Sequence, residues 1–95
     1  MARSVATVPS ENGWKYLQQL CKHWSHKLDV ELGEKTGTIR FAEATATMSA
    51  DETGLTVAID AASDEVLERM EGVVANHLDR FAFREAPLPF EWRAD

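Results

Sequence analysis

The sequence predicts an α+β fold in which two helices cover one face of a single antiparallel sheet. Residues 11–27 and 63–83 carry apolar side chains at the three- and four-residue spacing of amphipathic helices. Between them, residues 28–60 alternate apolar and polar residues in short runs separated by tight polar turns. Such turns favour antiparallel pairing, because parallel strands need long crossovers. A sheet with one apolar face needs helices on that face, so we expect a two-layer sandwich.

The first elements are a short strand and a helix. Residues 4–8 are β-prone and end at Pro9, and Ser10 is of a type favoured as a helix N-cap. The helix predicted from about residue 11 to Lys27 has one apolar stripe, which consists of Trp14, Leu17, Leu20, Cys21 and Trp24.

Four strands should follow the first helix. They are residues 28–32, 38–41, 44–50 and 55–59. Turns at 33–37 and 51–54 and a bend at 42–43 separate them, and Gly, Asp and Thr in these turns are typical of tight chain reversals.

The second helix is expected to begin after Ser63 or a neighbour, with Asp64 and Glu65 in the first turn, where the helix dipole favours acids. Its buried face is predicted to consist of Val66, Met70, Val73, Val74 and Phe81. Prolines at 87 and 89 limit residues 88–92 to an edge strand at best.

The predicted order is therefore β-α-β-β-β-β-α-β within one domain, residues 1–95. This order is similar to the TATA-binding-protein-like arrangement. The similarity concerns the fold and implies no function.

Composition excludes several classes of protein. Hydrophobic residues make up 44% and charged residues 27%, as in an ordinary globular domain. A net charge of −6 and a pI near 5.0 speak against binding to duplex nucleic acid, which needs cations. The sequence shows neither a secretory signal nor a run of about 20 apolar residues, so we expect a cytoplasmic protein that does not enter the membrane.

Cys21 is the only cysteine, so the chain can form neither an internal disulfide nor a cysteine-based zinc site. It belongs to the apolar stripe, and on a regular helix it lies about 160° from His23, too far for one ion to bind both. We expect Cys21 to be buried and its thiol to be unreactive. A catalytic dyad of Cys21 and His77 would require the two helices to lie side by side.

The three histidines leave two interpretations open. His23 and His26 are three residues apart, so they could bind a metal, or they could complement the dipole at the end of the helix. No third ligand is evident nearby in sequence, and we predict no metal or other cofactor. His77 lies within the apolar stripe of the second helix, where it should be a hydrogen-bonded core residue or face a pocket.

Residues 12–28 contain three lysines and two histidines but no acid, although the chain carries 16 acidic residues. Such a run is ordinarily a solvated helix face. The alternative is an anion site, because lysine and arginine suit carboxylates and phosphates. The proposed residues are Lys22, His23, His26, Lys27, Arg80 and Arg84.

Three motifs carry a family resemblance. They are the stretch from Tyr16 to Lys27, which contains Cys-Lys-His-Trp-Ser-His-Lys, the stretch from His77 to Glu85, and the pair Trp92-Arg93. Together they resemble the bacterial family of unknown function DUF2218 over nearly the whole chain. The resemblance implies a small bacterial protein with a loose link to iron and siderophore metabolism, where a siderophore-interacting flavin reductase is the implied partner. It supplies no catalytic residues.

The function predicted from these observations is a non-catalytic binding or accessory domain for a small anionic ligand. The sequence lacks a Gly-x-Ser-x-Gly motif, a phosphate loop and a dinucleotide fingerprint, which disfavours an enzyme. Two alternatives stay open. One is a small metal-dependent or histidine-based enzyme that uses His23, His26 and His77, and the other is a protein-interaction module.

Overall fold

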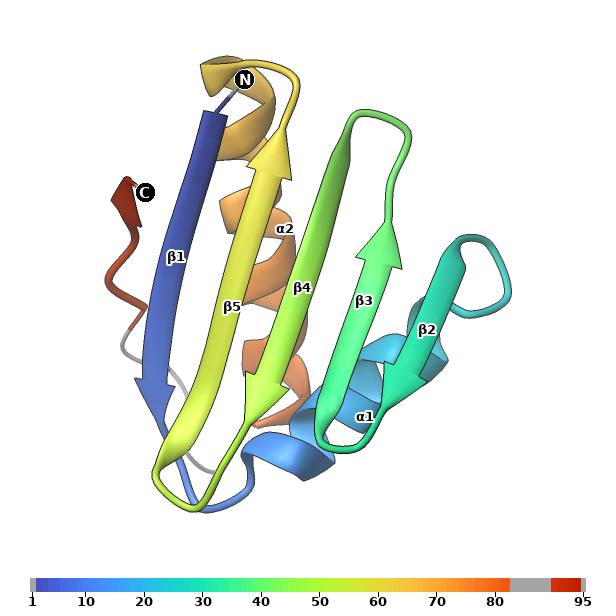
Figure 1. Cartoon of the computed structure of the whole chain (residues 1–95), viewed down its shortest axis with the longest axis vertical. Helices are drawn as coiled ribbons and strands as arrows, with labels where there is room; N and C mark the ends of the chain where they lie inside the picture. Colours follow the sequence, from blue (N-terminus) through green and yellow to red (C-terminus); the bar gives the residue numbers. More distant parts are fainter. Residues whose placement is uncertain (1, 83–89, 95) are drawn as a thin grey trace.

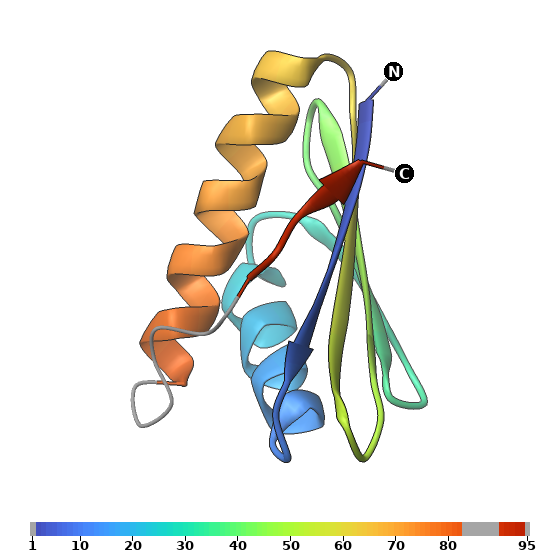
Figure 2. The same ribbon diagram turned by 90° about the vertical axis from the view of Figure 1, so that its left-hand side faces the viewer.

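The computed structural model describes residues 2–82 and 90–94 and has the predicted order of elements. The elements are β1 (Ala2–Pro9), α1 (Gly13–Trp24), β2 (Asp29–Gly33), β3 (Thr36–Arg40), β4 (Ala44–Ala50), β5 (Gly54–Ala61), α2 (Asp64–Phe81) and β6 (Arg93–Ala94) (Figure 1). Both helices lie on the same side of the sheet, whose other side is open (Figure 2). The predicted two-layer α+β architecture is confirmed.

The six strands form one antiparallel sheet in the order β2-β3-β4-β5-β1-β6. The first strand does not pair with β2, which follows it after α1. It lies instead beside β5, and both strands span eight residues. In the register, Val57 of β5 faces Ala6 on β1 and Met48 on β4. Because opposite residues share a face, these apolar side chains form one continuous row under the helices.

The two faces of the sheet differ as the period-two alternation predicts. The face under the helices is apolar and buried. The opposite face carries mainly hydroxyl side chains, namely Thr7, Thr36, Thr38, Thr45, Thr47, Ser49 and Thr56. Its rim holds exposed ion pairs, including Arg3 with Asp60 at 2.7 Å. Exposed ion pairs of this kind contribute little to stability.

The first helix ends at Trp24, three residues before the predicted end at Lys27. The amides of Lys27 and Leu28 both donate to the carbonyl of Trp24, which forms a turn that leads into β2. Ser10 is not the N-cap, which is Asn12, a residue without a side-chain capping bond. The Ser10 hydroxyl instead accepts from the Asn12 amide at 3.0 Å, so it closes the turn before the helix.

The second helix begins as predicted, since the Ser63 hydroxyl accepts from the amide of Val66 at 3.2 Å. Its predicted end near residues 82–84 and the first residues of the expected strand 88–92 fall partly outside the described residues. In the described part, the last strand lies just beyond the expected range 88–92, at Arg93–Ala94, and pairs with the edge of β1. No helix in this part of the chain is long and apolar enough to cross a membrane.

One polar contact lies inside the helix–sheet layer. Ser4 of β1 is 2% exposed, and its hydroxyl donates to the carboxylate of Glu71 on α2 at 2.5 Å. A half-buried carboxylate that loses such a donor retains part of its desolvation cost. The contact therefore ties α2 to the first strand.

We expect Ser4→Ala to lower the free energy of unfolding by about 1–3 kcal/mol, because Glu71 then loses this hydrogen bond. Urea denaturation followed by circular dichroism measures the change. Ser49→Ala is the matched control, since Ser49 is exposed on the open face of the sheet. Equal losses in the two variants would show that the buried hydrogen bond contributes nothing.

Candidate functional site

The last turns of α1 and α2 meet in a group of rings, which we call the helix-end cluster. It consists of His23, Trp24, Phe41, His77 and Phe81. The His23 and His77 ring centroids are 5.2 Å apart, and His23 also lies 6.0 Å from Phe81. The two helices thus place one histidine each at their junction.

Trp24 forms the base of this cluster. It is 8% exposed, packs edge-on against Phe41 at 5.0 Å, and lies 4.7 Å from the ring of His77. Phe41 follows β3 directly, so the contact fixes the end of α1 on the sheet. The sequence predicted Trp24 as a stripe residue but gave no sign of its partner Phe41.

His77 is half-buried, and its Nδ1 lies 2.7 Å from the carbonyl oxygen of Val73. A carbonyl can only accept, so Nδ1 carries the hydrogen and donates it. In the neutral imidazole, the lone pair is then on Nε2. His77 is thus hydrogen-bonded, as one of the two interpretations predicted, but it is half-buried and not part of the core.

The fold separates His23 from His26. His23 belongs to α1, whereas His26 is exposed in the turn after it, and the ring partner of His23 on the second helix is His77. Within residues 2–82 and 90–94, no three His, Cys, Asp or Glu side chains are grouped for a metal ion. The predicted alternative of a site built from all three histidines is therefore not assembled.

Five of the six predicted anion-binding residues are exposed near the two helix ends: Lys22, His23, His26, Lys27 and Arg80. The sixth, Arg84, lies outside the described residues. None of the five has a carboxylate partner in the described part of the chain. Elsewhere, Arg3, Arg40 and Arg69 are ion-paired. Among the described residues, these five basic side chains therefore form no ion pair.

Lys22 points away from the helix-end cluster. On a regular helix it lies about 100° from His23, and it lines a groove of about 430 Å³ between α1 and β2. The groove is lined by Gln18, Cys21, Lys22, Ser25, Val30 and Leu32. Leu32 is 53% exposed, and its strand forms an edge of the sheet. The predicted anion-binding set thus spans the outer surface of α1 and is not one compact pocket.

Cys21 contributes to the floor of this groove and is fully buried, as predicted. Burial raises the pKa of its thiol. A Cβ atom on Gly37 of β3 would lie 2.7 Å from the Cys21 sulfur, so the thiol packs directly on the sheet. His77, in contrast, contacts His23 on the flank of α1 that faces α2. The Cys21–His77 dyad, which was conceivable only with the helices side by side, is not formed, because the two side chains lie on different sides of α1.

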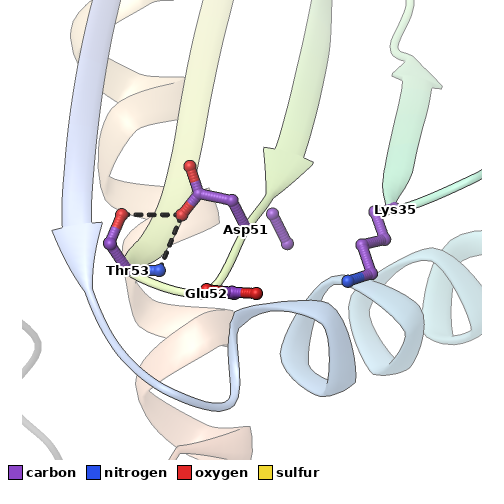
Figure 3. A pocket seen from close by; sticks show the side chains of 5 residues that line it. Lys35, Asp51, Glu52 and Thr53 are labelled. Atoms are coloured by element: carbon purple, nitrogen blue, oxygen red, sulfur yellow. Dashed lines mark hydrogen bonds between the residues drawn. The ribbon is translucent and has the colours of Figure 1, made fainter.

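A second hollow, of about 420 Å³, lies between two turns of the sheet (Figure 3). Lys35 comes from the β2–β3 turn, and Asp51, Glu52 and Thr53 come from the β4–β5 turn (Figure 3). The Asp51 carboxylate accepts from the amide and the hydroxyl of Thr53 at 2.8 and 2.7 Å, and these bonds lower its pKa. The Asp51 carboxylate therefore stabilises the predicted turn at residues 51–54.

Two comparisons place the chain among known proteins. The model of the family DUF2218, described as an uncharacterized protein conserved in bacteria, matches residues 5–93. The chain is also similar to the NMR structure of PA4090 from Pseudomonas aeruginosa, with 33% sequence identity and a TM-score of 0.84. That similarity covers 98% of this chain and 96% of the other. No curated protein matches the chain.

Proposed function

The chain belongs to DUF2218, a family of uncharacterized proteins conserved in bacteria, and we propose its function from the side chains exposed on its surface. The protein is a non-catalytic binding domain that holds a small anionic ligand at the basic ends of α1 and α2. The binding residues are His23, His26, Lys27 and Arg80 at the helix ends, with Lys22 on the adjoining flank of α1, and Arg84 follows in the sequence. The link to siderophore metabolism, and to a flavin reductase as partner, rests on the family resemblance.

One observation carries this proposal. The ring contact between His23 and Phe81 joins the last turns of the two helices, so basic side chains from distant parts of the sequence share one end of the molecule. They lack carboxylate partners in the residues that the structure describes, although the net charge is −6. Asp29, the first acid after this basic run, already forms an ion pair with Arg40 at 3.1 Å.

The chemistry of the ligand follows from these groups. Lysine and arginine form charge-assisted hydrogen bonds with carboxylate or phosphate oxygens. The carbonyl groups at helix C-termini carry partial negative charge, so the side chains, not the backbone, must supply the attraction. The rings of the helix-end cluster add an apolar surface next to them. A small planar anion with an aromatic ring, such as a catecholate or an aromatic carboxylate, matches both features.

Catalysis receives no comparable support. The buried Cys21 thiol has a raised pKa, and a protonated, inaccessible thiol is a poor nucleophile. Binding without covalent chemistry is the simpler function for this surface.

We expect 2,3-dihydroxybenzoate to bind the protein, while citrate and phosphate bind more weakly because they lack the ring. Amide chemical shifts of protein freed of metal ions on a chelating resin should move for residues 22–27 and around Arg80. Binding should weaken with added salt, since exposed charges are screened beyond about 10 Å at 0.1 M ionic strength.

The double substitution Lys22→Gln and Lys27→Gln should weaken binding at least several-fold, and Arg80→Gln should do the same. Lys15→Gln is the matched control, because Lys15 is an exposed lysine near the opposite end of α1. Stability should change little in all of these variants. The proposal fails if no anion shifts these amides at millimolar concentration, or if the control weakens binding as much as the double variant does.

A further inference from the structure

The His23–His77 pair has the spacing of a shared metal site. Their ring centroids are 5.2 Å apart and the ring planes are inclined by 52°. Two imidazoles bound to one tetrahedral zinc ion through bonds of about 2.0–2.1 Å have ring centroids roughly 5 Å apart. The two rings are tilted, as Trp24 and His77 are at 46°, and are not stacked face to face like Phe90 and Trp92 at 9°.

His77 also has the backbone partner that metal-binding histidines commonly have. Its Nδ1 donates to the carbonyl of Val73 at 2.7 Å. A hydrogen bond of this kind fixes the tautomer and the orientation of the ring, and it makes the other nitrogen more basic. Nε2 is therefore the nitrogen of His77 that is left for a metal ion.

The backbone at this point favours a cation, although basic side chains lie nearby. The C-terminal ends of α1 and α2 converge here, and the carbonyl groups at helix C-termini carry partial negative charge. Trp24 and Phe81 border the pair and hold the rings in place. Lys22, His26 and Arg80 are basic neighbours, but their exposed side chains can turn into solvent.

We infer that His23 and His77 bind one divalent transition metal ion of the type that imidazole prefers, such as Zn²⁺, Ni²⁺ or Cu²⁺. The protein supplies two ligands, and water or an anion occupies the remaining positions. This inference goes beyond the proposed function, because the ion binds through neutral imidazoles and needs no anionic ligand. It also differs from the site that spacing alone suggested, which paired His23 with His26.

The affinity should be intermediate. Structural zinc sites use four protein ligands, and a site with half that number is expected to have a Kd of about 1–100 µM. Isothermal titration of the full chain with Zn²⁺, in a non-coordinating buffer free of organic anions and phosphate, should show one ion per chain.

His23→Gln and His77→Gln should each weaken Zn²⁺ binding at least ten-fold. His26→Gln is the matched control, since it removes a histidine from the same helix end, and it should leave the affinity within two-fold. Absence of binding at millimolar Zn²⁺ would overturn the inference, as would an equal loss in all three variants.

A second measurement does not depend on whether the variants fold. In ¹⁵N spectra of the imidazoles of the unmodified protein, Zn²⁺ should shift His77 Nε2 and one nitrogen of His23, while both nitrogens of His26 keep their positions. Shifts confined to His26, or no shifts at all, would overturn the inference. Because the anion titration uses metal-free protein and the zinc titration contains no anionic ligand, each proposal can fail while the other holds.

Discussion

We expect Trp24→Ala to lower the free energy of unfolding by about 3–5 kcal/mol, the range for removing a large aromatic side chain from a core. Trp24 is 8% exposed and contacts Phe41 and His77 through its ring. The change therefore leaves a cavity where α1, α2 and the end of β3 meet. Urea denaturation followed by circular dichroism measures the loss.

Trp14→Ala is the control for this prediction, because Trp14 lies on the same helix and is only half-buried. Its loss should be clearly smaller. Trp24→Phe keeps an aromatic ring in the cluster, so its loss in free energy of unfolding should be less than half of the loss in Trp24→Ala. If the two tryptophan-to-alanine variants unfold at the same urea concentration, then packing in the helix-end cluster adds no stability beyond that of a half-buried tryptophan.

Trp24 also orients the pair of histidines. In folded Trp24→Ala, the rings of His23 and His77 lose their common base, so Zn²⁺ should bind more weakly than to Trp24→Phe.

The architecture could be predicted because the fold depends on periodicity. The period-two spacing of Leu55, Val57 and Ile59 identifies a buried face of β5, and these three side chains are buried in the structure. Boundaries were less predictable, because they depend on local hydrogen bonds. The end of α1 is set by two amides that share the Trp24 carbonyl, and apolar spacing carries no information about such a bond.

The candidate site was predicted in part. Each histidine could be identified singly, but spacing relates residues only within one helix, and so it paired His23 with His26. The contact of His23 with His77 depends on how α1 and α2 cross on the sheet. The same limit applies to Ser4 and Glu71, which meet through the packing of α2 on β1.

At Gly37 of β3, side chains of α1 pack directly on the sheet, and no pattern in the sequence marks this contact. A Cβ atom at this position would lie 2.7 Å from the sulfur of Cys21 and 2.9 Å from Cδ2 of Leu17. Both of these side chains are fully buried and cannot move into solvent. The absence of a side chain at Gly37 thus sets the distance between the helix and the sheet.

We expect Gly37→Ala to lower the free energy of unfolding by about 1–3 kcal/mol, the usual cost of an added methyl group in a packed core. Gly72→Ala is the matched control. A Cβ at Gly72, in the middle of α2, meets nothing within 4 Å. There, alanine should stabilise the helix by about 0.5–1 kcal/mol, because glycine is the poorer helix former.

Combining Gly37→Ala with Cys21→Ala tests the cause directly. Removing the sulfur makes room for the new methyl group, so the double variant should lose less stability than the sum of the two single losses, with a coupling of about 0.5–3 kcal/mol. The remaining contact with Leu17 should keep the rescue incomplete. Urea denaturation of the four proteins completes the cycle. Strict additivity, or a stabilising Gly37→Ala, would show that α1 does not pack on β3 at this distance.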